Sequence, residues 1–370
     1  MPSCIANRLM PKQSPSAQSR SFAQWLEQGW YQPNQRRFYL LPLSCLFYLI
    51  SALRRFAYRS GLLASFKAPV PLIVVGNINV GGSGKTPVVV ALIDALKKAG
   101  YQPAVISRGY GGVSPNYPLA VTESTPPSMC GDEPALIARR CKVPVVVGPD
   151  RVAAVKYLLK TFPCDVIISD DGLQHYALRR DIELVVIDAA RGLGNGELLP
   201  AGPLRELPER LKKVFAVLVN GKFDSSSPSS STALPDFVRN TAASFELCAE
   251  GFVHLQTKAC QSRLPTYQKL TAIAGIGNPQ RFFSSLKSQG LIFSALPYPD
   301  HHAYQAEDLV AINTELILMT EKDAVKCAAF NDPRIWYQPV SAQLPTDFLQ
   351  AVVARLSEIQ SLASDQESLP

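Results

Sequence analysis

A glycine-rich stretch that follows an apolar run is the first place where the residue types of this chain can do chemistry. The sequence from position 72 to 86 is LIVVGNINVGGSGKT. Glycines let backbone N–H groups close around phosphate oxygens, a lysine adds positive charge at the outer phosphates, and a threonine hydroxyl can hold Mg²⁺. The residues that we expect to hold nucleotide phosphates are Asn79, Val80, Gly81, Gly82, Ser83, Gly84, Lys85 and Thr86.

The surroundings of this loop favour phosphate binding over a glycine-rich turn that binds nothing. β-Branched residues before the loop predict a strand, and apolar residues after it recur at helical spacing. One position departs from the pattern G-x-x-x-x-G-K-[ST], because Asn79 takes the place of the first glycine. The sequence therefore predicts a strand, a phosphate loop and a helix in succession.

Paired acids follow a second apolar run, DVIISDD, about 80 residues after the loop. In P-loop enzymes the acid at the end of such a strand holds Mg²⁺ directly or through water. We therefore expect Mg²⁺ to be held by Thr86 together with Asp170 or Asp171. Gln174 and His175 continue the same turn, so polar groups gather where the carboxyl end of the strand meets a ligand crevice. An ordinary acidic strand end is the alternative.

Four more charged residues follow strand-like runs or begin helices. Arg108 lies in a glycine-rich loop, where a single arginine suits an anionic ligand, although a plain turn explains it equally well. Asp132 and Glu133 begin a helix, so they can cap it, serve as a general base or support a metal indirectly. Arg151 also begins a helix and is a candidate contact to phosphate or substrate.

Two of the four histidines are adjacent, in the run Asp300-His301-His302. This run lies at a turn after a strand-like segment, and the run TEKD at 320–323 lies at the next such turn. A histidine pair beside an acid can bind zinc, but no third or fourth ligand is apparent in the sequence. Surface histidines at the start of a helix are the competing interpretation.

Alternating strand-like and helical runs must position these residues. The first strand-like runs lie at 72–75, 103–107, 143–147, 165–171, 183–188 and 214–220. Strands that alternate with helices predict an α/β fold, with a P-loop-containing nucleotide hydrolase-like, mostly parallel sheet flanked by helices. Further strand-like runs at 269–275, 291–296 and 316–320 predict a smaller C-terminal α/β domain.

The length of 370 residues fits two domains with short flanking segments. The boundaries that we predict are 1–35 for a flexible N-terminal tail, 36–66 for an apolar and basic membrane-associated helix, 67–240 for the P-loop core, 241–265 for a linker, 266–358 for the smaller domain and 359–370 for a flexible C-terminal tail. The serine-rich run 225–232 is expected to be a tolerant surface linker.

An apolar run near the N-terminus points to a lipid surface. The sixteen residues 38–53 carry no charge and lie between two arginine pairs, at 36–37 and 54–55. The run is too far from the N-terminus for an ordinary signal peptide, and it is shorter than the roughly 20 residues of a comfortable spanning helix. An interfacial helix, with its arginines drawn to anionic lipid, fits best. A helix packed on the domain and a spanning segment are the alternatives.

The net charge of +7 comes from this N-terminal part and not from the fold. Residues 1–70 hold nine Lys or Arg and one acid, a balance of +8, so the rest of the chain sums to about −1. We therefore expect no nucleic-acid partner. The eight cysteines form no C-x-x-C pair and show no zinc-like spacing, which indicates small core residues in a reducing compartment, the cytoplasm.

The order of these motifs resembles that of the tetraacyldisaccharide 4'-kinase family, the lipid A 4'-kinases of Gram-negative bacteria. The motifs that carry the resemblance, over roughly residues 35–350, are VGNINVGGSGKTP, SRGYGG, GDEP, DDGLQH, LLPAGPLRE, AGIGNPQRF, DHH and TEKD. The resemblance implies a kinase that transfers the γ-phosphate of ATP to the 4'-hydroxyl of a tetraacylated glucosamine disaccharide 1-phosphate. It further implies Mg²⁺ and a peripheral or monotopic position on the cytoplasmic face of the bacterial inner membrane.

The resemblance also assigns roles to individual residues. Asp132 would be the catalytic base, His301 of the smaller domain would orient it, and Lys85 would act on the ATP phosphates. The choice between His301 and His302 stays open at this point. The candidates for substrate or transition-state contacts are Arg108, Glu133, Arg151, Gln174 and His175.

Two other classes of function compete with a kinase. A regulatory P-loop GTPase or metallochaperone needs N/T-K-x-D after a strand, but TEKD at 320–323 has these letters in the wrong register, and NGKFD at 220–224 also misses the pattern. A non-catalytic, membrane-associated ATP-binding scaffold would keep the loop without needing the distant Asp132 and His301. Competition between ATP and GTP for binding distinguishes a regulatory GTPase from a kinase. Phosphate transfer to a glycolipid acceptor distinguishes a kinase from a non-catalytic scaffold.

Overall fold

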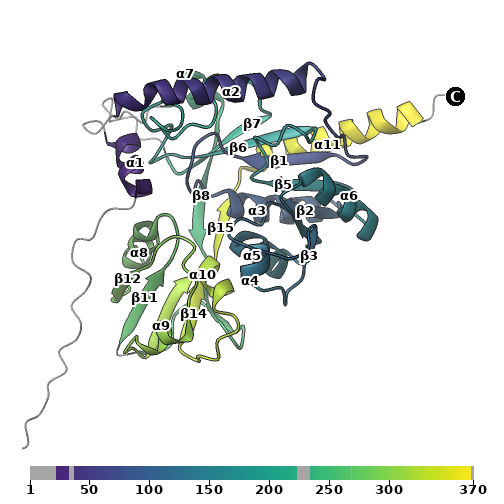
Figure 1. Cartoon of the computed structure of the whole chain (residues 1–370). Coiled ribbons are helices and arrows are strands. Elements are labelled where there is room, and N and C mark those ends of the chain that lie inside the picture. Colours follow the sequence, from purple (N-terminus) through teal and green to yellow (C-terminus); the bar gives the residue numbers. More distant parts are fainter. Residues whose placement is uncertain (1–21, 33–36, 223–233, 268, 368–370) are drawn as a thin grey trace, which may run out of the picture.

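The computed structural model describes residues 22–32, 37–222, 234–267 and 269–367. The expectations for residues 1–21 and for the serine-rich run 225–232 lie outside this described part. Within it the chain forms two sheets, a larger one in the upper half of Figure 1 and a smaller one in the lower half.

Nine strands make the larger sheet, in the order β15-β8-β7-β6-β1-β5-β2-β4-β3. Their bounds are Leu72–Gly76 (β1), Pro103–Ser107 (β2), Leu119–Val121 (β3), Val145–Val147 (β4), Val166–Asp170 (β5), Ile182–Asp188 (β6), Ala216–Asn220 (β7), Ala243–Ala249 (β8) and Val340–Gln343 (β15). Neighbouring strands are parallel except for β3 with β4 and β15 with β8, at the two outer edges. The mostly parallel α/β sheet predicted from the sequence is therefore confirmed.

Helices pack on both faces of this sheet, as the continuous apolar strands require. Their bounds are Lys85–Lys98 (α3), Pro127–Cys130 (α4), Asp132–Cys141 (α5), Arg151–Thr161 (α6), Pro208–Lys213 (the 3₁₀ helix η3), Asp236–Thr241 (α7) and Thr346–Glu367 (α11). Successive side chains of a strand point to opposite faces. Ile168 of β5 therefore joins the apolar core of α3, α5 and α11, whereas Ile167 joins the core of α6 and α7.

Six strands make the smaller sheet, in the order β10-β9-β14-β13-β11-β12. The elements of this sheet are Phe252–His254 (β9), Cys260–Gln261 (β10), Leu270–Ala274 (β11), Pro279–Ser288 (α8), Ser294–Pro297 (β12), Ala306–Val310 (α9), Leu316–Thr320 (β13), Glu321–Lys326 (α10) and Ile335–Gln338 (β14). Asn278 begins α8 as expected, since its side chain accepts a hydrogen bond from the N–H of Arg281 and Pro279 follows it.

The chain passes between the two sheets twice, which differs from the expected boundaries. Residues 241–265, expected as a linker, supply β8 to the larger sheet and β9 and β10 to the smaller one. Each sheet with the helices packed on it is one unit of the structure. After β14, the chain returns as β15 and α11 to the larger unit, where Val352 and Leu356 are fully buried. Apolar residues four positions apart form one stripe of a helix, and this stripe closes the face that α3 and α5 leave open.

Both expected tails contain a helix within the described residues. Phe22–Tyr31 forms α1, and Trp30 is buried with its indole N–H donating to the carbonyl of Pro200 at 2.9 Å. At the other end α11 continues to Glu367. The segments 1–35 and 359–370, expected as flexible tails, therefore include helical residues, those of α1 and the last residues of α11.

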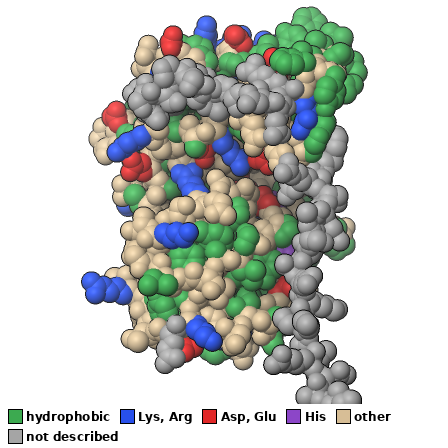
Figure 2. Space-filling view, turned by 90° about the vertical axis from the view of Figure 1, so that its left-hand side faces the viewer, with side chains coloured by type: hydrophobic (Ala, Val, Ile, Leu, Met, Phe, Trp, Pro, Cys, Tyr) green, Lys and Arg blue, Asp and Glu red, His purple; other side chains and the backbone are tan. Residues whose placement is uncertain are grey.

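The apolar N-terminal run forms η2 (Phe38–Leu40) and α2 (Leu41–Arg59), and Pro42 lies in the first turn of α2 rather than interrupting it. Phe38–Arg59 is long and apolar enough to cross a membrane, and only 6% of its most apolar window is buried. Its large exposed hydrophobic side chains are Phe38, Tyr39, Leu43, Leu46, Tyr48, Leu49, Ile50, Leu53 and Phe56. Hydrophobic side chains gather at the top of the molecule in Figure 2, the end at which Figure 1 shows α2.

Candidate active site

The phosphate loop lies between β1 and α3, at the carboxyl edge of the larger sheet. Gly84 precedes α3 with φ +94°, a conformation that glycine adopts without a steric penalty. Two side-chain amides bind backbone carbonyls of the loop. Asn77 Nδ2 donates to the carbonyl of Gly81 at 3.2 Å, and Asn220 Nδ2 donates to the carbonyl of Ser83 at 3.2 Å. Neither amide was predicted as a site residue. Asn220 ends a predicted strand, which is the signal that could have indicated it.

Asn79, the departure from the glycine pattern, has a structural partner. Its side chain is buried, and its Nδ2 donates to the carbonyl of Gly192 at 3.2 Å. The next residue, Val80, donates its backbone N–H to the carbonyl of Pro203 at 2.9 Å. The first position of the loop therefore ties it to two segments that follow β6. The partners lie more than 100 residues away, so no local pattern indicates them.

Asp170 ends β5, which pairs with β1 so that Val75 lies beside Asp170. The side chain is almost fully buried, and neither carboxylate oxygen has a hydrogen-bond partner in the described structure. Burial, with the negative charges of Glu133 and Asp171, raises the pKa of Asp170 to about 7. A buried carboxylate without a partner is costly, so this group is the strongest indication of a cation site.

Asp171, which has φ +48°, faces positive charges instead. Its Oδ1 lies 3.5 Å from Lys85 Nζ and 3.6 Å from Arg205 Nη1. Burial alone would raise the pKa of Asp171, but the charges of Lys85, Arg205 and Arg151 lower it below its usual range. The pKa values of the two neighbouring acids therefore shift in opposite directions, up for Asp170 and down for Asp171.

Arg151 lies beneath the two acids. It is buried, and its Nη2 donates to the backbone carbonyl of Asp170 at 3.0 Å, while Nη1 has no partner. Burial lowers the pKa of Arg151 to about 10, although both carboxylates oppose this. Arg108 is exposed on its loop and forms no hydrogen bond or ion pair with the described residues. Of these two predicted contacts, Arg108 is the one free to meet a ligand.

Gln174 and His175 lie on the turn after the acids. Gln174 Nε2 donates to the carbonyl of Asn77 at 3.2 Å and to Glu206 Oε1 at 3.0 Å, and its Oε1 accepts from Arg205 Nη1 at 3.2 Å. Gln174 thus joins the phosphate loop to the segment that carries Arg205. Burial, followed by the charges of Arg151 and of Arg54 in α2, lowers the pKa of His175 to about 4, so its imidazole is neutral at physiological pH.

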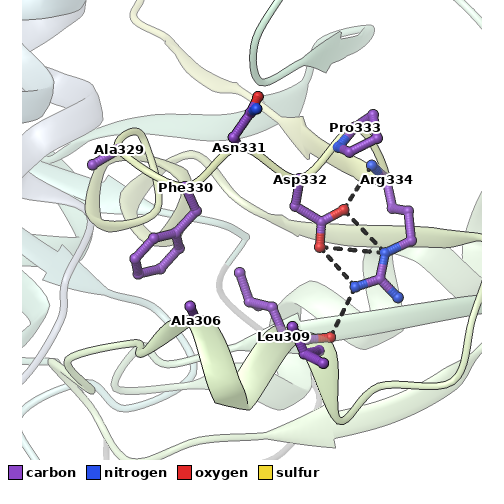
Figure 3. Close-up of a pocket in the computed structure, with 9 residues that line it drawn as sticks. Ala306, Leu309, Ala329, Phe330, Asn331, Asp332, Pro333 and Arg334 are labelled. Atoms are coloured by element: carbon purple, nitrogen blue, oxygen red, sulfur yellow. Dashed lines mark hydrogen bonds and ion pairs between the residues drawn. The ribbon is translucent and has the colours of Figure 1, made fainter.

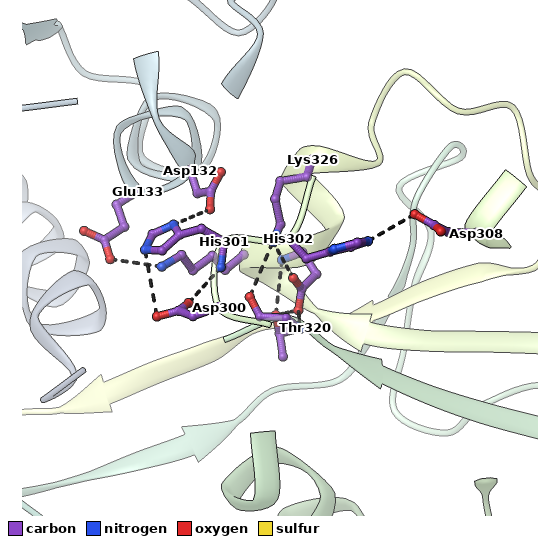
Figure 4. A network of polar contacts seen from close by, with 11 residues as sticks. Asp132, Glu133, Asp300, His301, His302, Asp308, Thr320 and Lys326 are labelled. Carbon is purple, nitrogen blue, oxygen red and sulfur yellow. Dashed lines mark hydrogen bonds and ion pairs between the residues drawn. The ribbon is translucent and has the colours of Figure 1, made fainter. Parts of the chain in front are cut away.

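Asp132 and His301 meet although 169 residues separate them. Asp132 is the first residue of α5 in the larger unit, and His301 lies on the loop after β12 in the smaller one. Their closest approach, His301 Nδ1 to Asp132 Oδ2, is 3.0 Å (Figure 4). The ring of Tyr110, from the loop after β2, meets the imidazole edge-on at a centroid distance of 5.2 Å.

The structure separates the two adjacent histidines. His301 has φ +59°, which turns its side chain toward Asp132, whereas His302 Nε2 lies 3.1 Å from Asp308 Oδ2 in its own unit. His302 also stacks on Tyr298 at a centroid distance of 4.5 Å. The described residues include no group of three or more His, Cys, Asp or Glu side chains suited to a metal ion. The zinc interpretation of the histidine pair therefore has no support.

The TEKD run holds the loop that carries His301. Thr320 Oγ1 donates to Asp323 Oδ2 at 2.6 Å, and the same carboxylate accepts from the backbone N–H of Gly275 at 3.0 Å. The carbonyl of Gly275 in turn accepts from the N–H of His301 at 3.2 Å. Asp323 is fully buried, and its Oδ1 pairs with Lys326 at 2.7 Å. The motif is therefore hydrogen-bonded to the segment that holds the backbone of His301.

Further polar contacts join the two units. Lys322 Nζ lies 3.3 Å from Glu133 Oε1, and burial would lower the pKa of Lys322, but Glu133, Asp300 and Asp132 raise it above its usual value. Arg281 of α8 reaches the larger unit, where it pairs with Asp188 Oδ2 at 3.0 Å and donates to Asn220 Oδ1 at 2.8 Å. Neither cation was predicted.

The residues present fit Mg²⁺. Both oxygens of Asp170 lack partners among the described residues, the buried hydroxyl of Ser83 also lacks one, and Thr86 is the second residue of α3, which follows the loop. Carboxylate and hydroxyl oxygens are the hard ligands that Mg²⁺ prefers, together with phosphate oxygens.

A cavity of about 460 Å³ lies elsewhere, on the smaller unit (Figure 3). Its lining residues are Ala306, Leu309, Val310, Ala329, Phe330, Asn331, Asp332, Pro333 and Arg334. No predicted site residue lines it, and Arg334 is already engaged by Asp332, so this cavity is not part of the site.

Comparisons with known proteins identify the family of the chain. The sequence model of the family described as Tetraacyldisaccharide-1-P 4'-kinase matches residues 36–357. The chain is 46% identical over 341 residues to a protein named tetraacyldisaccharide 4'-kinase from Methylobacillus flagellatus, covering 92% of this chain and 98% of the relative. It is 47% identical over 317 residues to the protein of that name from Haemophilus influenzae, covering 85% and 91%.

A solved structure shares the fold. It is described as the "apo" form of LpxK from Aquifex aeolicus in complex with ATP, and it is 29% identical in sequence. The superposition has a TM-score of 0.70 and covers 86% of this chain and 98% of that one.

Proposed function

The chain belongs to the tetraacyldisaccharide-1-phosphate 4'-kinase family, and from that premise we propose how its residues carry out the reaction. As a member it is an ATP-dependent lipid A 4'-kinase, which transfers the γ-phosphate of ATP to the 4'-hydroxyl of a tetraacyldisaccharide 1-phosphate. The observation that carries the proposal is the contact between Asp132 and His301, next to Glu133, whose charge raises the pKa of Asp170 at the end of β5.

Nucleotide binding belongs to the loop from Asn79 to Thr86 in this proposal. The backbone N–H groups of its glycines cradle the phosphates, and Lys85 adds positive charge beside Asp171 at 3.5 Å. Mg²⁺, held by Thr86 with Asp170 and Asp171, would neutralise charge on the transferring phosphate.

Acid–base chemistry belongs to Asp132. Its carboxylate accepts the proton of the sugar hydroxyl as that oxygen attacks, in line with the leaving group. His301 donates from Nδ1 to Asp132 Oδ2 and so fixes the orientation of the carboxylate. Because the two residues come from different units, approach of the units assembles the base and keeps out water that would waste ATP.

We expect charged residues around Asp132 and His301 to contact the acceptor. Arg108 is exposed and free to meet an anionic substrate, while Glu133 is held by Lys322. Arg151 and Gln174 act by supporting the acids and the loop, because Arg151 is buried and bonded to the carbonyl of Asp170 and Gln174 is bonded to the loop. His175 is half-buried and offers a neutral imidazole to the acceptor.

A glycolipid substrate lies in a membrane, and α2 has exposed apolar side chains that can bind a membrane surface. We place its exposed apolar side chains in the anionic, cytoplasmic leaflet of the inner membrane, as a peripheral or monotopic attachment. Replacing Leu46, Ile50 and Leu53 by serine should lower binding to anionic vesicles by roughly tenfold or more. Transfer to a detergent-dispersed acceptor should persist, since α2 lies outside the proposed chemistry. Unchanged vesicle binding would remove this role from α2.

The decisive assay measures transfer of γ-phosphate from ATP to a disaccharide 1-phosphate lipid in detergent. We expect a phosphorylated lipid product with ATP, much less with GTP, and none with the Lys85→Ala variant, which loses charge at the outer phosphates. ATP binding without transfer would indicate the scaffold instead, and preferential binding of GTP would indicate the switch. Product formation by Lys85→Ala at the normal rate would remove the loop from the mechanism.

A further inference from the structure

Arg191 lies directly against the phosphate loop. The loop glycine Gly81 has φ +115°, and a Cβ built there would lie only 2.7 Å from Arg191 Nη1. At Gly82 the same construction meets nothing within 4 Å. One guanidinium therefore lies against the loop at Gly81, within a loop whose backbone N–H groups are suited to phosphate oxygens.

The turn that carries Arg191 is fixed to the loop. It follows β6, the parallel neighbour of β1, and the N–H of Gly192 donates to the carbonyl of Asp188 at 2.8 Å. The carbonyl of Gly192 accepts from Asn79 Nδ2. The residue that breaks the glycine pattern of the loop thus holds the segment from which the guanidinium extends.

Helix α1 contacts the guanidinium from its other side. Glu27 Oε1 pairs with Arg191 Nη2 at 3.1 Å, and the ring of Tyr31 lies 5.3 Å from the guanidinium carbon. Tyr31 also donates its hydroxyl to the carbonyl of Val80 in the loop at 3.5 Å. The Glu27 side chain is 45% exposed, so this ion pair is weak and leaves Nη1 facing the loop.

We propose that Arg191 binds the phosphate chain of ATP as a second cation beside Lys85. This inference rests on the proposed kinase function and adds a residue to its nucleotide site. A planar guanidinium offers paired N–H donors to phosphate oxygens, and in phosphoryl transfer an arginine in this role also stabilises charge in the transition state.

The competing interpretation is structural: Arg191 only pins α1 to the core through Glu27. Two variants separate these roles, because both break the ion pair but only one removes the cation. Arg191→Gln removes the charge, whereas Glu27→Gln keeps it. Arg191→Lys retains a charge without the planar pair of donors. Melting temperatures of all three variants, without nucleotide, report whether each folds.

The experiment measures the Kd for ATP by calorimetry and kcat/KM in the lipid transfer assay. We expect Arg191→Gln to raise the Kd about 10- to 100-fold, with kcat/KM falling at least as far. Arg191→Lys should recover part of this, and Glu27→Gln should stay within about threefold of the wild type on both measures.

Equal losses in Arg191→Gln and Glu27→Gln, or ATP binding by Arg191→Gln within threefold of the wild type, would overturn the inference. The wild-type protein assayed in parallel keeps the two hypotheses apart. If it transfers phosphate normally while Arg191→Gln binds ATP normally, only the role of Arg191 fails.

Discussion

The phosphate loop and the pair Asp132–His301 are held in place in two different ways. The loop is fixed mostly from within the larger unit, by Asn77, Asn79 and Asn220 and by its position between β1 and α3. The pair is one hydrogen bond between a helix start in one unit and a loop in the other. Nucleotide binding is thus built into one unit, while the acid–base chemistry depends on how the two units meet.

The meeting surface is nevertheless substantial. Helix α5, which begins with Asp132, packs on α10, and Val325 of α10 joins the apolar core of the larger unit. Arg140 of α5 pairs with Glu321 at 2.6 Å, and Arg139 donates to the carbonyl of Val325 at 2.9 Å. The geometry of the pair is therefore set by side chains distributed along α5, so a change at this surface should reach the base.

The largest effect is expected for Asp132→Asn, which tests whether the base and the phosphate loop act separately. The variant keeps the shape of the side chain but cannot accept a proton, so we expect kcat to fall about 10²- to 10⁴-fold. The KM for ATP should stay within a few-fold, because the loop does not depend on Asp132. Steady-state kinetics with varied ATP at saturating acceptor measure both. A rise in the KM for ATP as large as the fall in kcat would show that the two parts of the site are not separable.

A smaller effect is expected at the histidines, which form a matched pair of neighbouring residues. His301→Ala should lower kcat about 10²-fold, because Asp132 loses the donor that orients it. His302→Ala removes only contacts inside the smaller unit, to Asp308 and Tyr298, and should leave kcat within a few-fold. The same assay compares them. A larger loss in His302→Ala would reverse the assignment.

The smallest effect is on stability and concerns Asp170. Its raised pKa means that the folded state prefers the protonated form, whereas an unfolded carboxyl ionises near pH 4. Stability contributed by the protonated group is therefore complete below about pH 4 and is lost as the pH rises toward about 7. Asp170→Asn stays neutral, so it should raise the melting temperature at pH 8, without Mg²⁺, by roughly 3 °C or more and change it little at pH 4.

Asp165→Asn is the control for this prediction. Asp165 lies just before the other end of β5 and accepts a hydrogen bond from the N–H of Gln102 at 2.7 Å. Its replacement should not raise the melting temperature at pH 8. Scanning calorimetry at pH 4, 6 and 8 gives the comparison, and a melting temperature for Asp170→Asn below that of the wild type at pH 8 would contradict the account of a costly buried charge.

The elements that depend only on nearby residues could be predicted from the sequence. Strands such as β1 and β5, the start of α8 and the phosphate loop follow from apolar periodicity, caps and glycines within a few residues. The return of β15 and α11 could not be predicted this way, because it depends on which apolar stripe remains uncovered after the rest of the core has packed. The expected smaller domain, 266–358, therefore includes residues of β15 and α11 that pack with the larger sheet.

The site divides in the same manner. Residues within motifs, such as Lys85 and Asp170, were indicated by their own sequence context. His301 and His302 differ in backbone conformation and in their partners, Asp132 and Asp308, and the sequence of two identical neighbours does not reveal this difference. Asn79 and Arg191 have partners in distant segments, so their contacts appear only when the chain is folded.

The return of α11 has a consequence for how the chain is made. Domains generally fold in turn from the N-terminus as the ribosome releases them. Here the side chains of Val352 and Leu356 complete the core that α3 and α5 begin more than 200 residues earlier. The larger unit must therefore keep an apolar face uncovered until α11 has been synthesised, and a chain that stops after the smaller sheet leaves that face open.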